Sequence, residues 1–552
     1  MWVLGFAPVS SGAKTFDRSP LIPLERFFAN PVKLGAQLSP DGTRLSYLAP
    51  VGGQLNIFVR TIGKNDDRAI THDRRQRIFN YFWSRDGKRI LYLQDKAGNE
   101  NTHLYAVDTN NRNAQAVDLT PFDKVRVDEI IALPRDAPAE ILLTLNKRDS
   151  QVFDVYNLNL YTGELWLVAE NPGNIGWWLA DSKGNLNAAV TIPSDGGREI
   201  LTRETQSAPW RVVAKYTNED SFSPIRLAAN GQSLYARSAK DSDKRRLVSV
   251  NLSDGAERTI DQDSEVDLND CIFSEKTGEL LGTTYIRDRT IYRAFDPRFK
   301  KDIALLKKIH PGDFRIASMD ADERRWIVIY TSDIEADVTY LYNRTTEKTQ
   351  FLFTPFPWTR SVKLAPVKPI SLTSPDGLAL HGYLTLPIGR NPKNLPMILK
   401  VHGGPWGERD RWAYDQEVQF LANRGYAVLQ INYRGTTGYG KKFARAAIHE
   451  FAGKMHDDLI DGVNWAVKRG IADPKRVAIY GGSYGGYATL VGLTFTPDFF
   501  ACGISLNGMS NLVTLIKSFP VYWKPFLWMD DWLDLPGLSC YHYCCCCHGT
   551  SG

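Results

Sequence analysis

A single pattern recurs seven times in the first two thirds of this sequence: an apolar strand, a polar turn and a second apolar strand. The clearest copies are residues 36–47 and 81–92, which share the turn dipeptide Asp-Gly. Weaker copies follow at residues 132–145, 176–190, 225–237, 271–285 and 317–331. Successive turn centres lie about 44 to 50 residues apart, which is a typical spacing of blades in a β-propeller.

Most copies are followed by a further strand-forming segment. Residues 56–60, 103–107, 156–160 and 247–251 alternate apolar and polar side chains before the next turn. Four short strands in each of seven units predict a seven-bladed β-propeller over residues 30–353, after an N-terminal segment at 1–29. Two β-sandwiches with accidental spacing are the alternative, and the persistence of the register through seven copies argues against them. A propeller by itself implies no chemistry.

The last third of the sequence does not continue the repeat. Prolines punctuate a linker after residue 353, and residues 371–387 predict a hairpin around Asp376 and Gly377. Buried-strand patterns at residues 397–401 and 426–431 then alternate with helical patterns, of which residues 457–468 are the clearest. This alternation is typical of a parallel sheet. We therefore predict an α/β-hydrolase domain over residues 354–526.

The segment Gly481-Gly-Ser-Tyr-Gly-Gly486 lies between a predicted strand and a predicted helix. The pattern G-x-S-x-G in that context is the nucleophile elbow of α/β-hydrolases, which predicts Ser483 as the catalytic nucleophile. Gly481, Gly485 and Gly486 would keep side chains out of a crowded bend, and Gly482 would tolerate strained dihedrals. A phosphate-binding turn is the alternative, but the lysine of a P-loop is absent.

The loop after Val401 reads His-Gly-Gly-Pro-Trp. In this fold the corresponding loop supplies one N–H of the oxyanion hole, and the residue after the nucleophile supplies the other. We therefore expect Gly403 or Gly404, together with Tyr484, to hold a developing oxyanion; a simple strand-ending turn is the alternative reading. His402 precedes the elbow in the chain, so we expect it to orient this loop rather than to act as the base.

Four motifs, taken in order, together resemble those of a known enzyme family. They are residues 402–406, 432–440, 453–458 and 481–486. With them the chain resembles the prolyl oligopeptidase family of serine peptidases, and within it the acylaminoacyl-peptidase and dipeptidyl-peptidase-like branch. The resemblance covers about residues 22–526, because that family also places a propeller before its hydrolase domain. It implies cleavage of short peptides, a propeller that restricts access, and no cofactor. No paired-glutamate amine anchor stands out, so dipeptidyl and acylaminoacyl specificities both stay open.

The family would place an aspartate and then a histidine on loops well downstream of Ser483, and this chain departs from that pattern. Only residues 527–552 remain, and they form a cysteine-rich tail without a strand–helix–strand pattern. Chain order would allow a triad from this tail, but the spacing is too short for two sheet loops; its candidate members are Asp530, Asp531, Asp534, His542 and His548. Its four adjacent cysteines do not have zinc-ligand spacing. We expect a truncated or frameshifted C-terminus and an incomplete hydrolase domain.

Composition and hydropathy bear on the partners and the location of the protein. A net charge of +5 over 552 residues gives no reason to expect a nucleic-acid partner. No segment reaches the roughly 18 apolar residues of a membrane helix. The apolar start, residues 1–8, is too short for a signal peptide but would fit the remnant of one (residues 1–12), so cytoplasmic and periplasmic locations both stay open. We expect short peptides as substrates and no metal, and the sequence does not fix the oligomeric state. The alternatives to a serine peptidase are a non-catalytic propeller scaffold and an esterase that uses the same serine.

Overall fold

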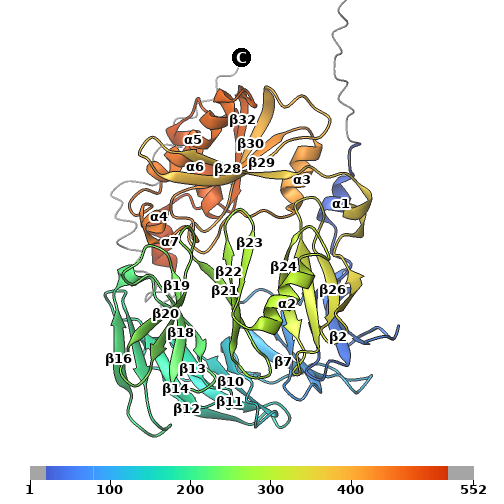
Figure 1. Ribbon diagram of the computed structural model, residues 1–552, viewed down its shortest axis with the longest axis vertical. Coiled ribbons are helices and arrows are strands. Elements are labelled where there is room, and N and C mark those ends of the chain that lie inside the picture. The colour runs from blue at the N-terminus through green and yellow to red at the C-terminus, as the bar shows by residue number, and fades with distance from the viewer. Residues whose placement is uncertain (1–19, 79, 520–552) are drawn as a thin grey trace, which may run out of the picture.

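The computed structural model describes residues 20–78 and 80–519, and its first two thirds form seven small antiparallel sheets around a common axis (Figure 1). Each sheet is one blade of a β-propeller, formed by consecutive strands. The blades are β1–β4 (Leu34–Leu38, Arg44–Val51, Gln54–Thr61, Arg68–Ala69), β5–β8 (Tyr81–Trp83, Arg89–Gln94, His103–Asp108, Val117–Asp118), β9–β12 (Val127–Ala132, Glu140–Leu145, Asp154–Asn159, Leu165–Ala169), β13–β16 (Ile175–Ala180, Leu186–Thr191, Arg198–Thr202, Arg211–Tyr216), β17–β20 (Ser223–Leu227, Ser233–Ser238, Arg246–Asn251, Glu257–Asp261), β21–β23 (Leu268–Phe273, Leu280–Ile286, Thr290–Ala294) and β24–β27 (Asp313–Met319, Arg325–Thr331, Val338–Asn343, Lys348–Phe353). The seven-bladed propeller predicted from the repeat is confirmed.

Blade 6 differs from the expected four strands, because a helix follows its third strand. Helix α2 (Pro297–Leu306) begins with proline, and the side chain of Asp296 caps it by accepting from the Phe299 N–H at 2.7 Å. Phe299 and Leu306 are fully buried and pack in a cluster with Trp326 of blade 7. The cap and the apolar stripe specify a helix here, so this blade has only three strands.

The ring closes between blades 1 and 7 without a shared strand, since every blade is formed from consecutive strands. Apolar side chains of both blades form one buried cluster that includes Leu38, Tyr47 and Ile327. Two hydrogen bonds add to it: Leu38 N–H donates to Ser318 Oγ at 3.1 Å, and Ala321 N–H donates to the Pro40 carbonyl at 2.8 Å. Side-chain packing therefore provides most of the closure.

The α/β unit follows the propeller and has a six-stranded sheet in the order β28-β29-β31-β30-β32-β33. The first two pairings are antiparallel, and the pairings among β31, β30, β32 and β33 are parallel. Its elements are β28 (Val367–Thr373), β29 (Ala379–Thr385), β30 (Leu395–Val401), α3 (Gln416–Asn423), β31 (Ala427–Asn432), α4 (Lys441–Arg445), α5 (Lys454–Lys468), β32 (Ala472–Gly482), α6 (Tyr484–Phe495), β33 (Cys502–Leu506) and α7 (Leu512–Ser518). A short helix α1 (Leu24–Phe28) and two 3₁₀ turns (Asn218–Asp220, Pro357–Ser361) complete the described elements. None of the helices in the described ranges has the length and apolarity to cross a bilayer.

Helices α5 and α6 form one core with the parallel strands. The apolar positions of α5 recur at helical spacing, so that Met455, Leu459 and Val463 all face the sheet and are buried. Helix α6 is apolar around most of its surface, and Tyr484, Tyr487 and Val491 join the same cluster. This packing holds α6 against the strands β30 and β32 at the point where each of them ends.

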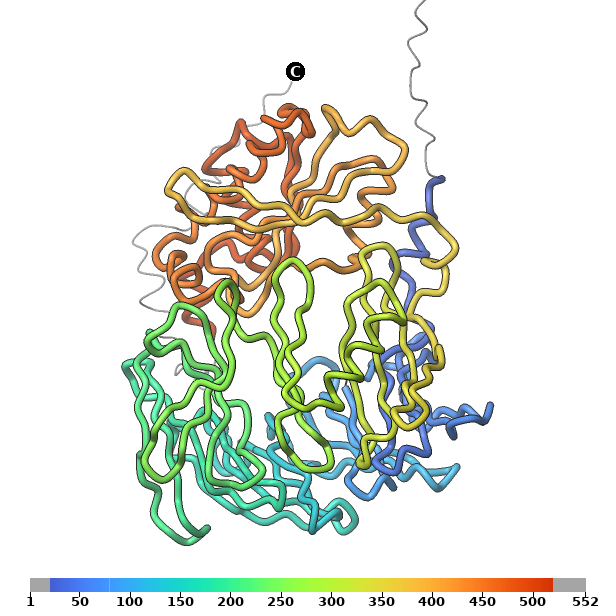
Figure 2. Tube along the Cα trace, in the orientation of Figure 1, coloured from blue at the N-terminus to red at the C-terminus, as the bar shows by residue number. Residues whose placement is uncertain are grey.

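The α/β unit rests on blades 5 to 7 through the hairpins between their second and third strands (Figure 2). In blade 5 the Asp243 carbonyl accepts from the Lys441 N–H at 2.8 Å. In blade 6 the Arg289 guanidinium lies 3.5 Å from the centre of the Trp412 ring. In blade 7 the Asp333 carboxylate accepts from the Val367 N–H at 2.8 Å.

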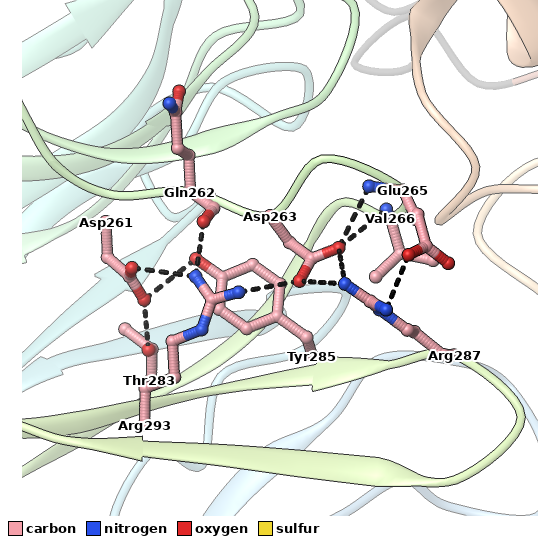
Figure 3. Close-up of polar contacts among 9 residues, drawn as sticks. All are labelled: Asp261, Gln262, Asp263, Glu265, Val266, Thr283, Tyr285, Arg287 and Arg293. Atoms are coloured by element: carbon pink, nitrogen blue, oxygen red, sulfur yellow. Dashed lines mark hydrogen bonds and ion pairs between the residues drawn. The ribbon is translucent and has the colours of Figure 1, made fainter.

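On the propeller side of this contact, an ion network surrounds Asp263 in the segment between β20 and β21 (Figure 3). The Asp263 carboxylate, fully buried, accepts from Arg287 at 3.0 Å, from Arg293 at 2.7 Å and from two backbone N–H groups. Burial alone would raise the pKa of Asp263, but these donors hold it below its ordinary value. The same segment, between β20 and β21, continues to Asp267, whose N–H donates to the Gly438 carbonyl of the α/β unit at 2.9 Å.

Candidate active site

Ser483 occupies the sharp turn between β32 and α6. Its backbone has φ +54° and ψ −118°, and its side chain is exposed. A non-glycine residue in such a conformation costs of order 1–3 kcal/mol and persists only where the surroundings enforce it. Here the Ser483 N–H donates to the Leu506 carbonyl at 2.9 Å, and the Ser483 carbonyl accepts from the Tyr487 N–H at 3.0 Å. The strain lies on Ser483 itself, because Gly482 has no positive φ, contrary to the expectation for that glycine.

The three remaining glycines of the motif are required by close packing. A Cβ at Gly485 would lie 2.1 Å from the Val401 carbonyl oxygen, and one at Gly486 would lie 2.7 Å from the Cα of Gly508. A Cβ at Gly481 would lie 2.6 Å from the carbonyl carbon of Gly485. All three contacts are with backbone, which cannot move aside as a flexible side chain can. The expected crowding around the elbow is confirmed.

Of the predicted oxyanion residues, Gly403 lies beside the nucleophile. A Cβ at Gly403 would meet the Ser483 Cβ at 3.5 Å and the Gly482 carbonyl oxygen at 3.4 Å. Gly404 has φ +109°, is exposed, precedes a cis peptide bond to Pro405 and has its nearest neighbours within its own loop. The geometry therefore brings Gly403 next to Ser483 and gives no such contact for Gly404.

Tyr484 is the first residue of α6, so its N–H lacks an acceptor within the helix. No described residue accepts a hydrogen bond from it either. The side chain is fully buried, where burial raises its pKa well above the ordinary value, and its hydroxyl donates to the Phe451 carbonyl at 3.2 Å. Its ring lies 5.3 Å from that of Tyr433. A buried side chain thus anchors the start of the helix and leaves the amide beside Ser483 available.

The His402 side chain contacts Tyr433, Thr436 and the backbone of Gly403. Its ring stacks on Tyr433 with centroids 4.5 Å apart, its Nε2 lies 3.0 Å from Thr436 Oγ1 and its Nδ1 lies 2.7 Å from the Gly403 carbonyl oxygen. The Tyr433 hydroxyl also donates to the His402 carbonyl at 3.0 Å. These contacts support the expectation that His402 orients the loop.

A buried ion pair that was not predicted from the sequence involves Arg434, the residue after Tyr433. The Asp458 carboxylate of α5 accepts from the Arg434 N–H at 2.8 Å and from its guanidinium at 2.9 and 2.7 Å. Asp376 of the first hairpin receives two further bonds at 2.9 and 3.1 Å, and the hydrogen bonds from Arg434 hold its pKa well below the ordinary range. The sequence signal was the arginine of the motif at residues 432–440 and the two aspartates of the motif at 453–458, one of which forms this pair.

The loop that starts at His402 continues to the propeller. Arg409 donates to the Ile286 carbonyl of blade 6 at 3.3 Å, and the Tyr414 N–H donates to the Ser332 carbonyl of blade 7 at 2.5 Å. A cavity of about 470 Å³ lies between residues 411–413 of this loop and strands of blades 5 to 7. The loop of residues 402–415 therefore runs from Gly403, beside the elbow, to a cavity between the two parts of the chain.

The partners of a serine nucleophile are not found in the described part of the chain. Within residues 20–78 and 80–519, no histidine or carboxylate forms a hydrogen bond with Ser483. The tail candidates lie outside the described residues; they are Asp530, Asp531, Asp534, His542 and His548. The predicted nucleophile and one predicted oxyanion residue thus lie side by side, and the base is unassigned.

Comparison with known proteins gives consistent matches. The model of the prolyl oligopeptidase family matches residues 412–535. Dipeptidyl aminopeptidase BIII of Pseudoxanthomonas mexicana is 39% identical over 528 residues, which are 94% of this chain and 76% of that protein. Dipeptidyl peptidase family member 6 of Caenorhabditis elegans is 30% identical over 92% of this chain and 73% of its own length. The structure of a Mycobacterium tuberculosis puromycin-hydrolysing peptidase has the same fold, with a TM-score of 0.72, 17% identity and coverage of 96% of this chain and 86% of that one.

Proposed function

This chain belongs to the prolyl oligopeptidase family and is a hydrolase of the serine-peptidase class, and we propose that it cleaves short peptides by attack of the Ser483 hydroxyl on the scissile carbonyl. The observation that supports this most is the exposed Ser483 at φ +54° with the Gly403 backbone beside it. A strained, exposed serine between a strand and a helix is the geometry of a nucleophile elbow.

In the proposed reaction the Ser483 oxygen bonds to the carbonyl carbon, and the carbonyl oxygen becomes an oxyanion. The N–H groups of Tyr484 and Gly403 are the proposed donors to it, with Gly404 as the alternative to Gly403. One such donor is worth about 2.7–4 kcal/mol in the transition state. A general base takes the Ser483 hydroxyl proton and passes it to the leaving amine as the C–N bond breaks and the carbonyl re-forms; water then hydrolyses the acyl-enzyme, and the Ser483 hydroxyl regains a proton. We assign the general base to no described residue.

The cavity of about 470 Å³ at the propeller contact is the proposed entrance for substrate. Its volume lies at the low end of the range for small-ligand pockets, about 300–1,000 Å³, which suits a few residues of peptide and excludes a folded protein. The propeller would therefore restrict access to short peptides.

Release of N-terminal dipeptides is the finer specificity that we propose. Two relatives that match more than nine tenths of this chain have dipeptidyl-peptidase names. The test compares a dipeptidyl anilide that has a free amino group with its N-acetylated form and with a short-acyl ester. Turnover of the free-amine substrate alone supports the proposal, whereas preference for the acetylated form or the ester contradicts it.

A fluorophosphonate probe tests the nucleophile directly. We expect covalent labelling of the folded protein, loss of labelling in Ser483→Ala, and retention of labelling in Ser505→Ala. Ser505 is a matched control, because it is also exposed and pairs with Gly481 on the adjacent strand. Absence of labelling in folded protein would favour the alternative of a non-catalytic scaffold.

A further inference from the structure

A second cavity, of about 300 Å³, lies on the propeller axis at the end away from the α/β unit. We name it the distal cavity. Residues of five consecutive blades, 2 to 6, line it, which requires a position on the axis; among them are Arg85, Arg135, Ser182, Arg226, Glu275 and Gly278. Most of these residues belong to loops between the first and second strands of their blades, whereas the α/β unit contacts the loops between second and third strands.

Positive charge exceeds negative charge in the distal cavity. Arg85, Arg135 and Arg226 come from blades 2, 3 and 5. The acidic residues among the described residues that line the cavity are Asp181 of blade 4 and Glu275 of blade 6. The Arg135 guanidinium reaches across the axis and donates to the Lys276 carbonyl at 2.7 Å and to the Glu275 carbonyl at 2.5 Å. Arg85 lies 3.8 Å from the Glu275 carboxylate, which is 53% exposed.

Arg226 has no such partner. Its guanidinium lies 4.7 Å from the centre of the Phe273 ring, and no described residue forms a hydrogen bond or ion pair with it. Burial lowers the pKa of both Arg226 and Arg85; the charge of Arg135 lowers both further, and the carboxylate of Glu275 only partly offsets this. Glu275 supplies one carboxylate beside three guanidinium groups from separate blades, so a small anion between them would stabilise the remaining positive charge.

We propose that the distal cavity binds a small oxyanion, a carboxylate or a phosphate, through Arg226 with Arg135 and Arg85 beside it. A guanidinium presents its N–H groups as a planar fork that matches two oxygens of either anion. A cavity of about 300 Å³ admits inorganic phosphate or the carboxylate end of a peptide. This site is separate from Ser483, so its test does not depend on the peptidase proposal.

Calorimetric titration of the full chain with inorganic phosphate tests the site. We expect binding to wild-type protein and a dissociation constant about tenfold or more higher in Arg226→Gln, as expected for loss of a charge-assisted hydrogen-bond pair. Arg258→Gln is the matched control, since it removes the same charge from the outer strand of the same blade, where Arg258 is exposed. We expect less than a twofold change in that variant.

Arg85→Gln is a second variant, in case Arg226→Gln fails to fold, and it should also weaken binding. The source of the anion is tested with an N-acetyl dipeptide acid and the corresponding amide. Binding of the acid but not the amide identifies a peptide carboxylate, and tighter binding of phosphate than of the acid identifies free phosphate. No binding of either anion, or equal binding by wild type, Arg226→Gln and Arg85→Gln, would overturn the proposal.

Discussion

Replacing Asp458 by asparagine is expected to destabilise the α/β unit by about 3 kcal/mol. The Asp458 side chain is fully buried and accepts three hydrogen bonds from Arg434, whose own side chain is 4% exposed. Removing one member of a buried ion pair costs about 3–5 kcal/mol, because the other charge remains without compensation. We choose the lower end of that range because Asp376, which is 37% exposed, continues to pair with Arg434.

The measurement is hydrogen–deuterium exchange, at pH 8, of the peptide that covers α5. This probe reports on the α/β unit separately from the propeller, whereas a single unfolding midpoint would average the two parts. A loss of about 3 kcal/mol corresponds to roughly a hundredfold faster exchange. Asp457→Asn is the matched control: the substitution is the same, the residue is the neighbour on the same helix, and its side chain is exposed. We expect its effect to stay within about 0.5 kcal/mol.

A paired variant tests the cause of the loss. Arg434→Met combined with Asp458→Leu removes both charges, so the double variant should be less destabilised than the sum of the single ones. The reasoning is refuted if Asp458→Asn exchanges no faster than Asp457→Asn, or if the double variant shows a fully additive loss.

Two further predictions concern the elbow and the pH dependence of stability. Gly485→Ala places a Cβ 2.1 Å from the Val401 carbonyl oxygen, so β30 and α6 must separate by about 1 Å. Fluorophosphonate labelling of Ser483 should therefore slow about a hundredfold. An unchanged labelling rate would contradict this prediction. Burial lowers the pKa of His456, whose Nε2 lies 3.1 Å from Thr496 Oγ1, so the unfolded chain binds more protons and stability falls as the pH drops through about 6.5. Exchange from α5 between pH 8 and pH 5 should therefore show a smaller loss of stability in His456→Gln than in wild type, and an equal loss would argue against it.

The sequence predicted those features whose cause is local. Strand–turn–strand units are specified by alternating side chains and turn residues within about twelve positions, which is why seven copies were recognisable. The elbow was recognised for the same reason, since its glycines, its serine and its flanking strand and helix are contiguous. Blade 6 was the exception, because the cap at Asp296 and the apolar stripe of α2 form a helix where the repeat predicts a fourth strand.

Contacts between distant segments needed the tertiary structure. Arg434 and Asp458 belong to different motifs, and their pairing follows from the packing of α5 on β31. The distinction between Gly403 and Gly404 depends on which of them meets the elbow, which lies some 80 residues further along the chain. Neither is encoded in a short stretch of sequence.

The sequence alone determined the number of blades, the order of propeller and α/β unit, and the identity of the exposed serine, because hydrophobic period and turn chemistry act between neighbouring residues. Only the tertiary structure decided that Ser483 bears the backbone strain, which glycine lies beside it, and that Arg85, Arg135 and Arg226 converge on the propeller axis. Ring closure and sheet packing set those distances, and they act between residues far apart in the chain.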